Sequence, residues 1–134
     1  MYGGTKMKSK IMLVDDNPDL TYLVKKRLER FDGAYEVVIA QNADECFELL
    51  KHGTLPDLIL LDIMMPGMNG WDVLATLRGN LPWKHIPVVF LTAKTDDVSK
   101  GLGTITSDGY ITKPFDISEL KETIEKVLEG KRNG

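Results

Sequence analysis

Residues 58–62, with the sequence Leu58-Ile59-Leu60-Leu61-Asp62, decide the expected fold, because four aliphatic residues in a row are followed at once by a carboxylate. An unbroken apolar run of this kind is typical of a central strand in a parallel sheet, buried on both faces. Three other short runs also end in a polar group: Lys10-Ile11-Met12-Leu13-Val14 before Asp15-Asp16, Val88-Val89-Phe90-Leu91 before Thr92, and Tyr110-Ile111-Thr112 before Lys113. The repetition indicates one shared site.

Helix-like segments separate these strand-like runs. A further strand is expected at residues 36–40, and helices are expected at residues 17–31, 42–52, 71–78 and 117–128. The alternation predicts a parallel sheet, since each crossover helix returns the chain to the same edge. Ligands of open parallel sheets sit beyond the carboxyl ends of the strands. We therefore expect an α/β fold with a five-stranded parallel sheet, helices on both faces, and a polar site at one edge of the sheet.

Length and composition allow one ordinary domain. The chain has 134 residues, of which 43% are hydrophobic and 28% charged, and its formal net charge is -3. It can build a core, has no general attraction to nucleic acid or anionic membranes, and lacks the ~20-residue apolar run of a transmembrane helix. A single cysteine and the absence of a signal-peptide pattern favour the cytoplasm. The expected boundaries are a flexible leader at 1–9, the domain at 10–129 and a flexible tail at 130–134.

The residues that end the strands suit phosphoryl chemistry. A carboxylate such as Asp62 can attack a phosphoryl donor to form an aspartyl phosphate. Asp16 and Asp62 are expected to bind Mg²⁺ directly and Asp15 through water, because this ion takes one or two carboxylates, retained waters and a phosphate oxygen. Lys113 would place a positive charge, and Thr92 a hydroxyl donor, against the phosphoryl oxygens. Each residue alone also fits a turn, a helix cap or a solvated surface, so it is the joint pattern that favours a site.

Four motifs together resemble the receiver domain of response regulators in two-component signalling, over roughly residues 10–128. They are Val14-Asp15-Asp16, the stretch LDIMMPGMNG at residues 61–70, Leu91-Thr92-Ala93, and Lys113-Pro114-Phe115. The resemblance implies a flavodoxin-like three-layer fold that acts in a phosphorelay. It also implies that Asp62 accepts a phosphoryl group from a sensor histidine kinase or a phosphotransfer protein. Such a domain is not an enzyme, apart from its own phosphorylation and dephosphorylation.

The same resemblance implies a role for each residue of the site. The metal ion, Mg²⁺ or Mn²⁺, is held by Asp15, Asp16, Asp62 and the Met64 carbonyl, and the phosphoryl oxygens are held by Thr92, Lys113 and the Ala93 amide. Thr92 then moves toward the phosphoryl group while Tyr110 turns inward, which changes a surface that binds a partner. The Lys113-Pro114 peptide bond is expected to be cis.

Two features depart from the family pattern. Residues 100–106 should form a helix, yet they hold two glycines and three consecutive β-branched residues, and each interior glycine costs about 1 kcal/mol relative to alanine. We therefore expect residues 97–107 to be the most mobile segment and to become more ordered when Asp62 is phosphorylated. The second feature is the turn before Tyr110, where the family usually has small residues and this chain has Ser107-Asp108-Gly109. The chain also ends soon after its last helix. Unless it is a fragment of a larger protein, this predicts a stand-alone receiver that acts on an unknown downstream protein, without direct contact to nucleic acid or membrane.

Two other functions fit parts of the pattern. A metal-dependent phosphatase could use Asp62 as its nucleophile, but such enzymes commonly carry a second aspartate two residues later, where this chain has Met64. A flavin-binding electron carrier of the same architecture needs a phosphate-binding loop after the first strand. Here that loop begins Asp15-Asp16-Asn17-Pro18, whose carboxylates repel a phosphate unless a cation is present.

Overall fold

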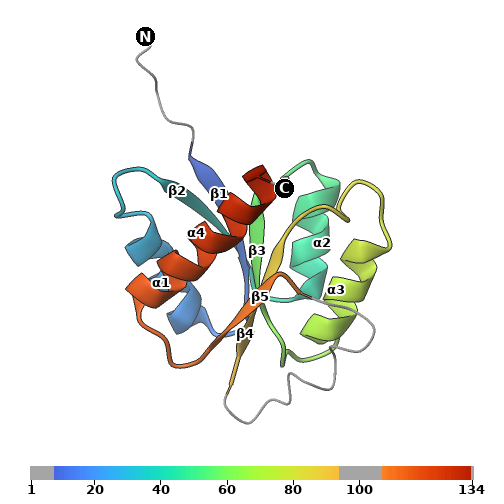
Figure 1. The fold of residues 1–134 in the computed structure, drawn as a ribbon. Coiled ribbons are helices and arrows are strands. Elements are labelled where there is room, and N and C mark those ends of the chain that lie inside the picture. The colour runs from blue at the N-terminus through green and yellow to red at the C-terminus, as the bar shows by residue number, and fades with distance from the viewer. Residues whose placement is uncertain (1–7, 94–106, 134) are drawn as a thin grey trace.

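The computed structural model describes residues 8–93 and 107–133. Within these ranges, strands and helices alternate around one parallel sheet with the strand order β2-β1-β3-β4-β5 (Figure 1). The elements, in chain order, are β1 (Ser9–Val14), α1 (Pro18–Leu28), β2 (Tyr35–Ala40), α2 (Ala43–Lys51), β3 (Leu58–Asp62), α3 (Gly70–Arg78), β4 (Val88–Thr92), β5 (Gly109–Thr112) and α4 (Ile117–Asn133). The predicted five-stranded parallel α/β fold is confirmed.

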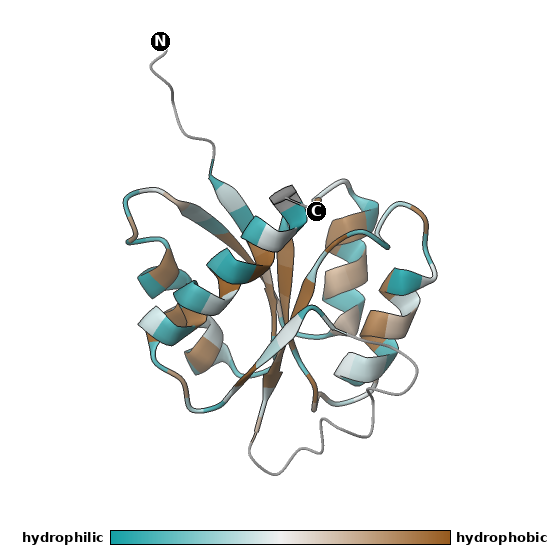
Figure 2. Cartoon of the chain, viewed as in Figure 1, coloured by the Kyte–Doolittle hydropathy of each residue, from teal (hydrophilic) through white to brown (hydrophobic). Residues whose placement is uncertain are grey.

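Helices α1 and α4 cover one face of the sheet, and α2 and α3 cover the other (Figure 1). Neighbouring residues of β3 point to opposite faces, as they do in any strand. Ile59 and Leu61 pack on the side of α2 and α3, whereas Leu58 and Leu60 pack on the side of α1 and α4, and all four are fully buried. Figure 2 shows the hydrophobic strands at the centre of the molecule. Burial on both faces therefore explains the unbroken aliphatic run.

Three of the helices begin at an asparagine that caps their first turn. Oδ1 of Asn17 accepts hydrogen bonds from two amides of α1, at 3.0 and 3.2 Å. Asn42 and Asn69 begin α2 and α3 in the same way. These side chains bond amides that the first turn of a helix leaves without a partner. Asp15 and Asp16 directly precede Asn17, so both lie in the short connection between the end of β1 and the start of α1.

Helix α1 ends earlier than the sequence predicts, at Leu28 instead of near Phe31. After Leu28, the amides of Arg30 and Phe31 bond to carbonyls three residues back, and Asp32 adopts a left-handed φ of 44°. A left-handed residue cannot continue a right-handed helix, and aspartate adopts this conformation more readily than most residues. The chain therefore turns here toward β2.

Helix α4 ends later than the sequence predicts. It continues to Asn133 instead of stopping at Leu128, so residues 130–133, which were expected in a flexible tail, are helical. Charged residues with good helix propensity flank Gly130, and their preference outweighs the cost of one glycine. At the other end of the chain Ser9, which was expected in the leader, already belongs to β1.

The expected weak helix at residues 100–106 lies outside the described residues, as does most of the expected mobile segment at 97–107. Strand β5 follows soon afterwards and pairs in parallel with β4. Among the described residues, no helix combines the length and the apolar character that crossing a membrane requires.

Candidate functional site

The polar residues that follow four neighbouring strands lie at one edge of the sheet. Asp15 and Asp16 follow β1, Asp62 ends β3, Thr92 ends β4, and Lys113 follows β5. The sheet order places these four strands side by side, and their registers align the carboxyl ends. The structure thus brings together the residues that the sequence predicted to meet.

Three carboxylates form the acidic side of this site. Oxygen atoms of Asp15, Asp16 and Asp62 all lie within 4.8 Å of one another. Asp15 is fully buried and Asp62 is nearly so, whereas Asp16 is exposed. Oδ1 of Asp15 accepts a 2.9 Å hydrogen bond from the Asn17 amide, which helps to fix the carboxylate. The oxygen donors and their spacing fit a hard divalent cation such as Mg²⁺.

Lys113 places a positive charge next to these carboxylates. Its Nζ lies 2.8 Å from Oδ2 of Asp15 and 3.5 Å from Oδ1 of Asp62. Its backbone amide donates to the Thr92 carbonyl at 2.6 Å, and the Lys113-Pro114 peptide bond is cis, as predicted. Burial alone would lower the pKa of Lys113, but the two carboxylates outweigh burial and raise it. The side chain is therefore held as an ammonium group.

The pKa of Asp62 is raised from 3.8 to about 6. Burial is the main cause, and the neighbouring charge of Asp15 adds to it. Lys113 acts in the opposite direction, as does the Met64 amide, which donates to Oδ1 of Asp62 at 3.4 Å. The positive charge of Lys113 alone thus does not compensate for the burial of Asp62 and for the carboxylates beside it. A divalent cation at this place would favour the ionised carboxylate, so the residues fit the predicted metal ion.

The other predicted residues differ in their exposure to solvent. Thr92 is buried at the end of β4, and Ala93 beside it is exposed. Tyr110 lies on β5 and is 58% exposed, so its side chain faces solvent in this conformation. Met64, which follows β3 and whose carbonyl is the predicted fourth ligand, also has an exposed side chain. Thr92 ends β4, Ala93 follows it, and Met64 follows β3. The hydroxyl, amide and carbonyl groups that were predicted to bind the phosphoryl group and the metal ion therefore lie at the carboxyl ends of these two neighbouring strands.

Residues 11–125 match a family model described as the response regulator receiver domain. The chain belongs to this family. The family match favours neither the phosphatase nor the flavin carrier that the sequence left open.

Relatives of this receiver domain include complete regulators and isolated domains. The chain is 39% identical over 121 residues to the transcriptional regulatory protein CpxR of Escherichia coli K12, a match that covers 90% of this chain and 49% of that protein. It also resembles two solved structures. The CheY-like receiver domain protein of Methanospirillum hungatei is 35% identical with a TM-score of 0.78, and the match covers 94% of this chain and 98% of that one. The receiver domain of a Syntrophus aciditrophicus histidine kinase is 30% identical with a TM-score of 0.81, and 91% of each chain is covered. The chain spans about half the length of curated relatives such as CpxR.

Gly70 is a residue of this receiver domain whose part in the site the sequence did not reveal. It is the first residue of α3, and its amide donates to the Ile63 carbonyl at 2.7 Å. A Cβ atom at this position would lie only 2.6 Å from the carbonyl oxygen of Asp62 and 2.8 Å from the Cα of Ile63. The absence of a side chain therefore lets α3 begin against the backbone of the central carboxylate. The Asn69-Gly70 pair signals a turn in the sequence, but it does not show which backbone the glycine approaches.

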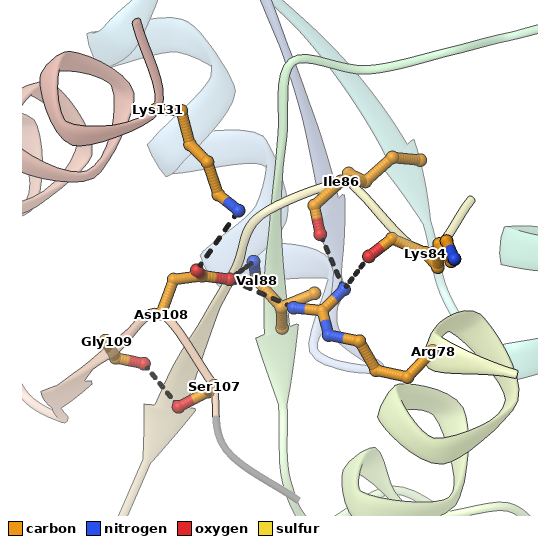
Figure 3. A network of polar contacts seen from close by, with 8 residues as sticks. All are labelled: Arg78, Lys84, Ile86, Val88, Ser107, Asp108, Gly109 and Lys131. Carbon is orange, nitrogen blue, oxygen red and sulfur yellow. Dashed lines mark hydrogen bonds and ion pairs between the residues drawn. The ribbon is translucent and has the colours of Figure 1, made fainter. Parts of the chain in front are cut away.

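A second polar network of the receiver domain lies at the amino ends of β4 and β5, away from the carboxylates (Figure 3). Oδ2 of Asp108 accepts hydrogen bonds from the Val88 amide at 2.8 Å and from Arg78 at 3.0 Å. Oδ1 of Asp108 lies 3.8 Å from Nζ of Lys131 on α4. Arg78 also donates to two carbonyls of the connection between α3 and β4, at 2.8 and 3.2 Å. The sequence identified Asp108 only as part of a turn, because no local pattern links it to a residue 30 positions earlier.

Proposed function

We propose that this receiver domain is a phosphoacceptor in a phosphorelay, with Asp62 as the residue that is phosphorylated. The observation that carries the proposal is the position of the Asp62 carboxylate at the end of a central strand, 3.5 Å from Lys113 and within 4.8 Å of Asp15 and Asp16. A sensor histidine kinase or a phosphotransfer protein would supply the phosphoryl group. A downstream protein would read the phosphorylated state.

The carboxylates Asp15, Asp16 and Asp62, together with the Met64 carbonyl, would hold Mg²⁺ or Mn²⁺. When bound, the ion would neutralise the carboxylates and polarise the transferred phosphoryl group. Lys113 contacts Asp15 and Asp62, whereas Asp16 is exposed to solvent. A phosphodonor would approach from the solvent-exposed side that carries Asp16.

Asp62 would attack the phosphorus atom of the donor with one carboxylate oxygen. A new oxygen–phosphorus bond forms while the bond from phosphorus to the leaving atom of the donor breaks, and the leaving group keeps that electron pair. The Lys113 ammonium attracts the phosphoryl oxygens, and the Thr92 hydroxyl and the Ala93 amide donate hydrogen bonds to them. The Lys113 ammonium lies 3.5 Å from Asp62 before any reaction, so its contribution would need little reorganisation in the transition state.

Thr92 and Tyr110 would convert phosphorylation into a change of surface. Tyr110 pairs in register with Phe90, which lies two residues before Thr92 on the neighbouring strand. A shift of Thr92 toward the phosphoryl group would leave space on its former side, and the exposed Tyr110 side chain would turn into that space. The two positions of Tyr110 present different surfaces to a partner, so a local charge change would bias a two-state element.

The test is phosphorylation by acetyl phosphate in the presence of Mg²⁺, followed by intact-mass measurement. Wild type should gain one phosphoryl group, and Asp62→Asn should gain none. Asp57→Asn is the matched control, because Asp57 lies just before the other end of β3, where its carboxylate accepts a 2.7 Å bond from the Lys10 amide. This control should be phosphorylated as wild type is. Equal labelling of Asp62→Asn and wild type would reject Asp62 as the acceptor.

A further inference from the structure

Strand β2 is an edge strand, yet the outward-pointing backbone N–H and C=O groups at its centre already have hydrogen-bond partners. The sheet order places β2 at the outside, and among the described residues β1 is the one strand that pairs with it (Figure 1). On its outer side, the Val37 carbonyl accepts a 2.7 Å hydrogen bond from Nζ of Lys25, and the Val37 amide donates a 2.9 Å hydrogen bond to Oε2 of Glu29. Both side chains come from α1. Glu29 is its C-cap residue.

The same two side chains also bind each other. Nζ of Lys25 lies 2.9 Å from Oε2 of Glu29, so one lysine, one glutamate and the backbone N–H and C=O of Val37 form a closed set of contacts. The pKa of Glu29 is lowered, because the Val37 amide and Lys25 together outweigh the opposite effect of burial. Glu29 is therefore an ionised acceptor. Lys25 and Glu29 are 41% and 34% exposed, whereas Val37 is 2% exposed, so the charged pair lies between the strand edge and solvent.

Val37 is the residue at which two copies of this strand would pair symmetrically. The Ser9 amide donates to the Ala34 carbonyl at 2.9 Å, and the Asp15 amide donates to the Ala40 carbonyl at 3.1 Å. The backbone N–H and C=O groups of the even-numbered residues of β2 therefore point toward β1. The outward groups therefore belong to Tyr35, Val37 and Ile39, because the peptide groups alternate along a strand. Val37 is the middle one. In an antiparallel pair around a two-fold axis, the two copies of Val37 would exchange both of their N–H···O bonds.

We propose that Lys25 and Glu29 close the β2 edge against pairing with a second copy of this chain. The central hydrogen bonds of such a pair would use the N–H and C=O groups of Val37, and Glu29 and Lys25 already bind both of these groups. The strand itself has the composition of a pairing edge, since Val37, Val38 and Ile39 are consecutive β-branched residues. Unpaired edges of this kind pair readily with other chains, and charged side chains are a common way of blocking them. Association of this protein is thereby directed away from β2, whether or not Asp62 is phosphorylated.

The experiment compares the double variant Lys25→Ala/Glu29→Ala with wild type by sedimentation equilibrium over a range of concentrations. The variant should self-associate at least about tenfold more tightly than wild type, which corresponds to about 1.4 kcal/mol. The matched control is Glu122→Ala/Lys126→Ala, which removes another lysine–glutamate pair of the same spacing from α4, with a 3.6 Å contact. This control should associate as wild type does, since the loss of an exposed ion pair alone uncovers no strand edge.

Hydrogen exchange at the Val37 amide locates the association. In the double variant this amide should exchange fast at low protein concentration and slowly at high concentration, because the second copy replaces Glu29 as its partner. A variant that stays monomeric while the Val37 amide exchanges fast would overturn the proposal. Association that leaves the amide fast at every concentration would also overturn it. Should the double variant unfold, Lys25→Met tests the same point, since it uncovers only the Val37 carbonyl and should associate more weakly than the double variant but more tightly than wild type.

Discussion

Replacing Gly70 by alanine should disturb the fold and the phosphoacceptor site together. The added Cβ would meet three backbone atoms: the Asp62 carbonyl oxygen at 2.6 Å, the Ile63 Cα at 2.8 Å and the Asp62 carbonyl carbon at 3.2 Å. Carbon atoms pack best at about 3.5–4.0 Å. Backbone atoms cannot rotate away as a flexible side chain can. Either the start of α3 or the Asp62-Ile63 backbone must therefore move by about 0.7–1.2 Å, which is the difference between that optimum and the 2.8 Å from Cβ to the Ile63 Cα.

The expected size of the effect follows from two opposing contributions. Overpacking of a tight site costs about 1–3 kcal/mol, and an overlap with backbone belongs at the upper end of that range. Alanine in a helix gains about 0.5–1 kcal/mol over glycine. The free energy of unfolding of Gly70→Ala should thus fall by about 2 kcal/mol. Gly130→Ala is the matched control, because Gly130 lies in α4 and a Cβ there would meet no atom within 4 Å apart from its chain neighbours and the nearby backbone of its own helix. This control should gain about 0.5–1 kcal/mol.

Urea unfolding and acetyl phosphate labelling of the two glycine variants test this reasoning. A displacement of about 1 Å at a reacting group can reduce the rate of its reaction about 100-fold. Gly70→Ala should therefore lose labelling rate at Asp62 as well as stability, whereas Gly130→Ala should be labelled as wild type is. If both glycine variants were stabilised equally, the close approach of α3 to the Asp62 carbonyl would not constrain residue 70. Loss of stability with an unchanged labelling rate would show that α3 moves and the site does not.

Two further predictions concern single carboxylates. The pKa of Asp62 is about 6 in the folded protein against an ordinary 3.8, so the folded state binds its proton more tightly and stability falls as pH rises through this window. Asp62→Asn cannot ionise, so in EDTA it should exceed wild type by about 3 kcal/mol at pH 7 and by little below about pH 4; a difference independent of pH in urea unfolding would contradict this. Asp108→Asn removes the charge that Arg78 and the Val88 amide bind, and should cost about 1–2 kcal/mol in urea unfolding. Glu122→Gln, at an exposed ion pair, should change stability by less than about 1 kcal/mol. An equal loss in both variants would show that the Asp108 network stabilises the fold no more than an exposed ion pair does.

The strands and the site were predictable for the same reason. Burial on both faces requires uninterrupted aliphatic residues, so β3 is visible in the sequence as Leu58 to Leu61. A parallel sheet then places the residue after each strand at one edge, whatever the loops do. Asp62, Thr92 and Lys113 could therefore be assigned to one site before any distance was known. Their positions depend on backbone topology, which a short sequence pattern determines.

Contacts that depend on how far a side chain reaches from one element to another were not predictable in this way. Lys25 and Glu29 were visible only as a lysine–glutamate pair on α1, a spacing that usually indicates a solvated helix face. Their bonds to Val37 follow from the packing of α1 beside β2 and from the parity of the strand register, and a shift of one residue would turn the Val37 peptide toward β1 instead. Neither the packing of α1 beside β2 nor the register of the strand has a local signature in the sequence. The composition of β2 thus indicates a strand, but whether the edge of that strand is open is decided by side chains on another element.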